Sequence, residues 1–106
     1  RLEMGEAAGR YADYSIITMD NPRFEKPEKI AEEIVTGIQR QNRNARFEVL
    51  LDRKKAIAKA ISMADGGDVV IVAGKGHEKY QEISGIRYFS DDHVLICEAL
   101  EQMKQM

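Results

Sequence analysis

Several residue types and patterns are scarce in this sequence of 106 residues, and each shortage excludes a class of protein. The single cysteine, Cys97, cannot form a disulfide within the chain, which favours a reducing compartment such as the cytoplasm. The two histidines lie far apart and have no cysteine pair near them, so we expect no metal site. No apolar run approaches the roughly 20 residues that span a bilayer, and the N-terminus shows no secretory signal. These shortages argue against a secreted, membrane-embedded or zinc-binding protein.

An excess of charge of one sign is also missing. The 16 basic and 18 acidic residues are well mixed and give a formal net charge of -2. A nucleic-acid partner would require a basic face, so we expect none. With 43% hydrophobic residues the composition is that of a globular domain, and the length suffices for one core but not for two. We therefore expect residues 1–106 to form a single domain.

What is present is an alternation of helical and strand patterns. The expected elements are a helix over 2–11, a strand over 14–18, a helix opened by Pro27, a strand over 47–51, a helix capped by Asp52, a continuous β-branched strand over 69–73, a hairpin over 80–83 and 86–89, and a last helix capped by Asp91 or Asp92. We expect Cys97 to face inward on that last helix. The order predicts an α/β fold, a Rossmann-like three-layer sandwich whose mostly parallel sheet has helices on both faces and ends in a β-hairpin.

Polar residues gather in two loops that follow predicted strands, where ligands bind in open α/β sheets. The loop at 20–25 offers the carboxylate of Asp20, the amide of Asn21 and the guanidinium of Arg23, whose planar fork suits a carboxylate or phosphate. The alternative is that Asn21-Pro22 is only a turn, in which Asp20 bonds to its own backbone.

The loop at 74–80 contains Gly74-Lys75-Gly76-His77-Glu78, in which the glycines allow a ligand to approach the backbone. It is not a P-loop, which requires a Gly-Lys-Ser/Thr ending. His77 is either a general base or a residue that orders its loop, and Lys75 either contacts a phosphate or faces solvent. Together the two loops offer anionic and cationic groups, which suits a zwitterion such as an amino acid.

The two loops contain the motif Asp20-Asn21-Pro22-Arg23 and, about fifty residues later, Gly74-Lys75-Gly76-His77-Glu78 with Tyr80-Gln81. This pair of motifs resembles that of the Mur ligases that add meso-diaminopimelate to a peptidoglycan precursor. The resemblance covers essentially the whole chain. It includes Met4-Gly5, Pro27, Asp52-Arg53 and Phe89-Ser90-Asp91-Asp92.

This resemblance implies that the sequence is the C-terminal, amino-acid-binding part of a three-domain ligase. Family members begin this part with a strand and a glycine-rich segment carrying a further arginine, and neither precedes Arg1. The first strand of the sheet is therefore expected to be missing. The central domain that binds ATP and Mg²⁺ and the N-terminal domain that binds the UDP-sugar are also expected to lie elsewhere. We expect the chain alone to be inactive, without catalytic residues or a bound cofactor.

The resemblance also implies roles for individual residues. In the family, ATP phosphorylates the terminal carboxylate of the UDP-N-acetylmuramoyl dipeptide, and the amino group of diaminopimelate then displaces phosphate to form an amide. Asn21 and Arg23 would hold the carboxylate remote from the attacking amine. Gly74, through its backbone, and Glu78 would hold the remote ammonium. Asp20 would order the loop or contact the amine.

Two other functions are compatible with parts of the sequence. One is a ligase for lysine or another amino acid, which the presence of Arg23 disfavours because lysine lacks the second carboxylate. The other is a non-catalytic module, such as a small-molecule sensor, which the presence of both loop motifs disfavours. The sequence therefore favours a diaminopimelate-binding part of a ligase.

Overall fold

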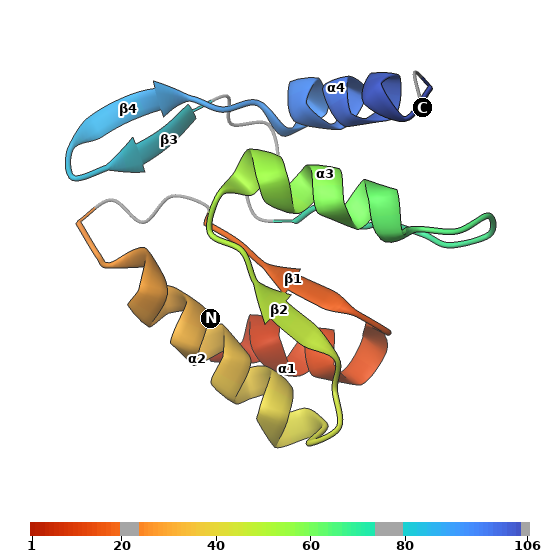
Figure 1. Cartoon of the computed structure of the whole chain (residues 1–106). Coiled ribbons are helices and arrows are strands. Elements are labelled where there is room, and N and C mark those ends of the chain that lie inside the picture. The colour runs from red at the N-terminus through yellow and green to blue at the C-terminus, as the bar shows by residue number, and fades with distance from the viewer. Residues whose placement is uncertain (20–23, 74–79, 105–106) are drawn as a thin grey trace.

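Helices and short strands alternate along the chain in a computed structural model that describes residues 1–19, 24–73 and 80–104 (Figure 1). The elements are α1 (Leu2–Tyr11), β1 (Ser15–Ile17), α2 (Pro27–Gln41), β2 (Phe47–Val49), α3 (Arg53–Met63), β3 (Tyr80–Ile83), β4 (Ile86–Phe89) and α4 (Asp92–Lys104). Pro27 opens α2, as expected for a residue whose missing N–H is not needed in a first helical turn. None of the described helices combines the length and the apolar character needed to cross a membrane.

A short parallel sheet forms the centre of the N-terminal half. β1 pairs with β2 in the register Ser15 to Phe47 and Ile17 to Val49. The Leu50 amide continues the pairing by donating to the Ile17 carbonyl at 2.9 Å. In Figure 1, α1 and α2 lie on one side of this pair and α3 lies on the other. The chain therefore has the α/β character that its sequence predicts.

Helices α1 and α2 pack against each other with their backbones in contact. A Cβ added at Gly37 would lie 2.3 Å from the Leu2 carbonyl oxygen, and one added at Gly5 would lie 2.1 Å from that of Ile34. Only glycine permits so close an approach, since any side chain would overlap the facing backbone. The close contact brings α1 against the core formed by Ile17, Ala31 and Ile38, with further apolar side chains around it.

We expect Gly37→Ala to lower the free energy of unfolding by about 1–3 kcal/mol, the usual cost of overpacking, although alanine is the better helix former. Gly66→Ala is the matched control, because a Cβ there would meet nothing within 4 Å. Urea denaturation of the two variants and the parent chain measures the difference. Equal stability of the two variants would contradict the close helix contact.

A second core joins α3 to α4. Ile57 and Ile61 of α3 are buried against Ala99 of α4, with partly buried Val72 and Leu95 beside them. Cys97 is exposed, so the expectation that it faces inward is wrong. The buried face of α4 passes through Leu95 and Ala99, and residue 97 lies on the opposite face of the helix.

Capping at the helix starts agrees with the sequence. The Lys55 amide donates to Asp52 Oδ1 at 3.1 Å, so Asp52 caps α3 as predicted. The His93 amide donates to Asp91 Oδ1 at 3.0 Å, which makes Asp91 the cap of α4. Asp92, the other candidate, is the first residue of the helix and has a different partner.

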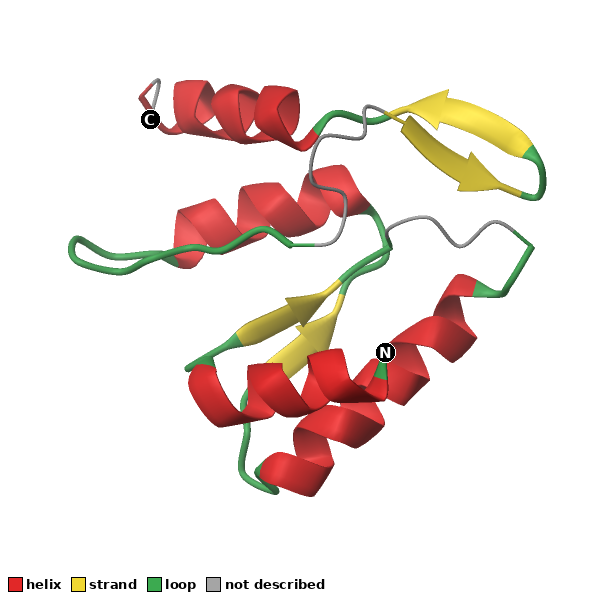
Figure 2. Ribbon diagram, turned by 180° about the vertical axis from the view of Figure 1, so that it is seen from behind, coloured by secondary structure: helices red, strands yellow, loops and turns green. Residues whose placement is uncertain are grey.

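The stretch 69–73 is not a strand, contrary to the prediction of a strand covered on both faces. It runs beside α3 as a loop (Figure 2), and Val69 and Ile71 are 84% and 83% exposed. Val72 alternates with them and packs on the second core. A β-branched run becomes a strand only when a neighbouring strand pairs with its N–H and C=O groups. In the described part of the chain β1 pairs only with β2, and β3 only with β4.

The described part of the C-terminal half contains one antiparallel pair. β3 and β4 pair from Tyr80 to Phe89 at one end and from Ile83 to Ile86 at the other. Ser84 and Gly85 join them with positive φ angles of 50° and 81°. Such angles match the right-handed twist of a two-residue hairpin turn.

One polar cluster fastens the parallel sheet to α3. Glu48 of β2 accepts hydrogen bonds from Lys59 Nζ at 2.7 Å and from the Tyr14 hydroxyl at 2.9 Å. The hydrogen bond from Lys59, followed by that from Tyr14, holds the pKa of the Glu48 carboxyl below its usual value. The same bond to Glu48 raises the pKa of Lys59. These groups are solvent-accessible, so the cluster aligns α3 with the sheet rather than forming a core.

Candidate functional site

The residues predicted to bind a ligand all lie in the two loops outside the described structure. Asp20, Asn21 and Arg23 fall in the segment 20–23, and Gly74 and Glu78 fall in the segment 74–79, as do Lys75 and His77. The structure describes the residues from which both segments start.

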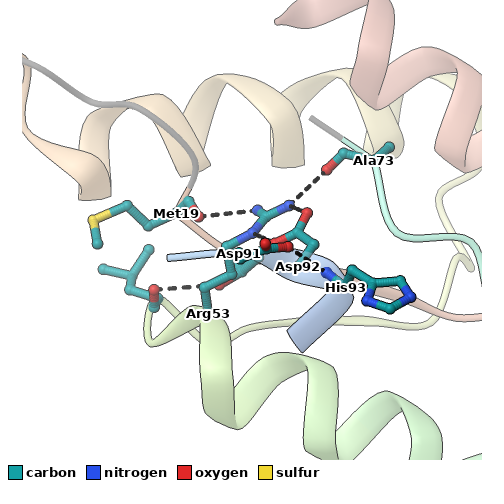
Figure 3. Close-up of polar contacts among 8 residues, drawn as sticks. Met19, Arg53, Ala73, Asp91, Asp92 and His93 are labelled. Atoms are coloured by element: carbon teal, nitrogen blue, oxygen red, sulfur yellow. Dashed lines mark hydrogen bonds and ion pairs between the residues drawn. The ribbon is translucent and has the colours of Figure 1, made fainter. Parts of the chain in front are cut away.

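Both segments leave the described structure next to one side chain, Arg53 at the start of α3 (Figure 3). Its Nη1 donates to the carbonyl oxygen of Met19 at 3.0 Å, and its Nη2 donates to that of Ala73 at 3.2 Å. Met19 directly precedes residue 20, and Ala73 directly precedes residue 74. One guanidinium thus holds the last described residue before each predicted binding loop.

Arg53 is fixed by a buried carboxylate on the other side of the guanidinium. Its Nε and Nη2 donate to Asp92 Oδ1 and Oδ2, each at 2.6 Å, in a bidentate ion pair. The side chains of Arg53 and Asp92 are 3% and 12% exposed, so water screens this pair little. The four bonds use four of the five N–H groups that an arginine carries.

The position of the pair follows from the two helix starts. A cation in the first turn of α3 is unfavourable in the helix dipole, whereas Asp92 in the first turn of α4 is favourable. Bringing the two starts together offsets the cost of the buried cation. The pair joins four segments: the end of β1, the start of α3, the end of 69–73 and the start of α4.

Sequence reasoning missed this pair. The sequence patterns place Asp52-Arg53 at a helix start and make Asp92 a possible cap, and both also belong to the family resemblance, but nothing in them predicts an ion pair. The available signal is the charge of Arg53, because a basic residue is unfavourable in a first helical turn. The sequence does not indicate which acid, since Asp92 lies 39 positions away.

The far end of the 20–23 segment is held separately. Arg1 forms a bidentate ion pair with Glu25 and approaches Glu33 Oε2 to 3.5 Å. The hydrogen bond from Arg1 keeps the pKa of the Glu25 carboxyl below its usual value. Both side chains are substantially exposed, so this contact is expected to contribute little to the free energy of unfolding.

The chemistry of the described site is that of a rigid support. Within residues 1–19, 24–73 and 80–104, no three His, Cys, Asp or Glu side chains are grouped so that they could hold a metal ion. Arg53 only donates, and each carboxylate oxygen of Asp92 accepts one of its hydrogen bonds. Together the two residues hold the two loop starts.

Comparisons with known proteins identify relatives of this chain. A family model described as "Mur ligase, glutamate ligase domain" matches residues 1–76. The UDP-N-acetylmuramoyl-L-alanyl-D-glutamate--2,6-diaminopimelate ligase of Aquifex aeolicus (strain VF5) is 53% identical over 93 residues, which cover 87% of this chain and 19% of that protein. The ligase of the same name from Clostridioides difficile (strain 630) is 47% identical over 100 residues, which cover 94% of this chain and 20% of that protein.

A solved structure of a ligase with this name has a similar fold. It superposes with a TM-score of 0.69 at 38% identity, over 84% of this chain and 18% of that one. The chain thus spans about a fifth of the length of the curated relatives that it matches. The resemblance predicted from the two loop motifs is confirmed at the level of the family, and the chain belongs to the Mur ligase family.

Proposed function

We propose that this chain is the amino-acid-binding part of a ligase that joins meso-diaminopimelate to UDP-N-acetylmuramoyl-L-alanyl-D-glutamate in peptidoglycan precursor synthesis. The observation that carries the proposal is that relatives 42–53% identical over most of the chain bear the name of that ligase. The convergence of both loop starts on Arg53 supports it, because two segments that hold one small molecule must be close together. A cytoplasmic location follows from this role.

In the proposed reaction, the terminal carboxylate of the UDP-linked dipeptide takes the γ-phosphoryl group of ATP, ADP leaves, and an acyl phosphate results. The amine of diaminopimelate then attacks its carbonyl carbon, the C–N bond forms, the C–O bond to phosphate breaks, and the amine proton is lost to solvent. This chain would hold the amino acid so that its amine faces the acyl carbon, a contribution of orientation. ATP and Mg²⁺ would be held by other parts of a longer ligase.

The two loops would divide the amino acid between them. Asn21 and Arg23 would bind the carboxylate remote from the attacking amine. The backbone of Gly74 and the carboxylate of Glu78 would bind the remote ammonium, and Asp20 would order its loop or contact the amine. Arg23 would select the substrate, because bound lysine leaves its guanidinium unpaired. A site built to pair a polar group rejects an analogue lacking it by about 10⁴-fold.

The proposal extends to the complete fold of the domain. A Rossmann-like three-layer sandwich would form if a strand from outside these 106 residues paired with 69–73. The outward exposure of Val69 and Ile71, beside an inward Val72, is the alternation that such a strand would have. Hydrogen exchange at the amides of 69–73 should then be slower in the natural full-length protein than in this chain alone. Equal exchange in both would refute the pairing.

The test of the function is an assay of phosphate release by the gene product that contains this sequence, at its natural length. The reaction contains ATP, Mg²⁺ and the UDP-linked dipeptide, with either meso-diaminopimelate or L-lysine. We expect turnover with diaminopimelate and none above background with lysine. Turnover with lysine would keep the ligase but refute the role of Arg23. A folded protein that uses neither amino acid would instead be a non-catalytic module.

A further inference from the structure

We propose that Arg53 is a positioning residue for the amino-acid substrate, acting by fixing the points from which segments 20–23 and 74–79 leave the core. This inference rests on the proposed function, since it concerns the same bound amino acid. Arg53 does not touch the substrate in this proposal. It acts through the two carbonyl groups that it holds.

The first step is the convergence of two distant segments on one rigid group. The Met19 and Ala73 carbonyls accept from the two terminal nitrogens of one planar guanidinium, at 3.0 and 3.2 Å. Since consecutive Cα atoms lie about 3.8 Å apart, the residue after each carbonyl starts within one peptide of this bond. A movement of the guanidinium therefore moves both loop starts together.

The second step is that the guanidinium cannot move easily. The Asp92 carboxylate accepts two hydrogen bonds of 2.6 Å from the guanidinium. Asp92 is itself part of the first turn of α4. That helix is anchored on α3 through Ala99, which packs with Ile57 and Ile61. The orientation of the fork is thus set by the packing of these two helices.

The third step separates positioning from stability. A buried guanidinium needs acceptors for its remaining N–H groups whatever its role, so the identity of those acceptors is what bears on positioning. Here the guanidinium also binds the two residues from which the candidate loops start. Misplacement of a bound reactant by 1 Å can reduce the rate about 10²-fold. In this proposal, a small shift of Arg53 changes the binding of the amino-acid substrate and leaves the binding of ATP and the UDP-linked dipeptide unchanged.

The experiment uses the double variant Arg53→Met/Asp92→Leu in the gene product at its natural length. Replacing both members of a buried ion pair by apolar residues is often neutral or stabilising, so the fold should survive. Methionine cannot donate to either carbonyl. We expect the KM for meso-diaminopimelate to rise at least about tenfold, while the KM for ATP stays within about twofold of wild type. A stable double variant whose KM for diaminopimelate is unchanged would overturn the proposal.

Two further variants complete the test. Arg53→Lys keeps the charge but not the fork, so it should also raise the KM for diaminopimelate, and it decides the question if the double variant does not fold. The control is Lys54→Met/Glu98→Leu, which removes an exposed ion pair of 3.8 Å between the same two helices. This control should leave every KM unchanged.

Hydrogen exchange distinguishes failure of this inference from failure of the proposed function. We expect the Arg53 variants to exchange faster at both 20–23 and 74–79, with unchanged exchange in α2. If the wild-type protein does not use diaminopimelate, the proposed function fails and the exchange result alone decides the role of Arg53. Unchanged exchange at the two segments would then refute it.

Discussion

Arg53→Met alone should lower the free energy of unfolding of this chain by about 3–5 kcal/mol, the usual cost of removing one partner from a buried ion pair. The variant leaves the Asp92 carboxylate, whose side chain is 12% exposed, without the two 2.6 Å bonds that compensate it. It also leaves the Met19 and Ala73 carbonyls without the bonds that Arg53 donates to them. Urea denaturation measures the loss.

The matched control for this prediction is Lys54→Met. Lys54 is the next residue of α3 and contacts Glu98 of α4 at 3.8 Å, but its side chain is 66% exposed. Its removal should change the free energy of unfolding by no more than about 1 kcal/mol. The Asp92→Leu/Arg53→Met double variant should recover most of the stability that Arg53→Met loses. If Arg53→Met lowers the free energy of unfolding no more than Lys54→Met does, the burial of the Arg53–Asp92 pair makes no difference to stability.

The elements that could be predicted from sequence are those defined by local patterns. α1, α2 and α3 follow from apolar spacing, from Pro27 in a first turn and from the Asp52 cap. Each of these signals acts within a few residues of chain. The parallel pairing of β1 with β2 also follows from the order of elements, because a helix between two short strands favours a parallel connection.

The features that could not be predicted depend on contacts distant in sequence. The stretch 69–73 has the composition of a buried strand, but a strand requires a neighbour, and the described chain does not place one there. The Arg53–Asp92 pair joins residues 39 positions apart, and neither residue marks the other as its partner. The loop motifs identify the family, whereas the residue that holds both loop starts emerges only from the folded arrangement.

Arg23→Ala should reduce kcat/KM for meso-diaminopimelate by about 10²–10⁴-fold in the gene product at its natural length. The proposed bidentate pair with the remote carboxylate comprises two hydrogen bonds between charged groups, each worth about 1.5–3 kcal/mol. Lysine has no such carboxylate, so its use should not fall and the preference for diaminopimelate should largely disappear. The same phosphate-release assay, run with both amino acids, measures the change in preference.

Lys26→Ala is the matched control for Arg23→Ala. It removes a cation three positions further on, at the start of α2, where the Lys26 side chain makes no capping hydrogen bond. We expect its kinetics with both amino acids to equal those of wild type, which would exclude a general effect of lost positive charge. Arg23→Lys should fall between the two, because an ammonium keeps the charge but cannot form the fork. If Arg23→Ala retains the preference for diaminopimelate, selection lies in another residue, and the proposed division of the amino acid between the two loops is wrong.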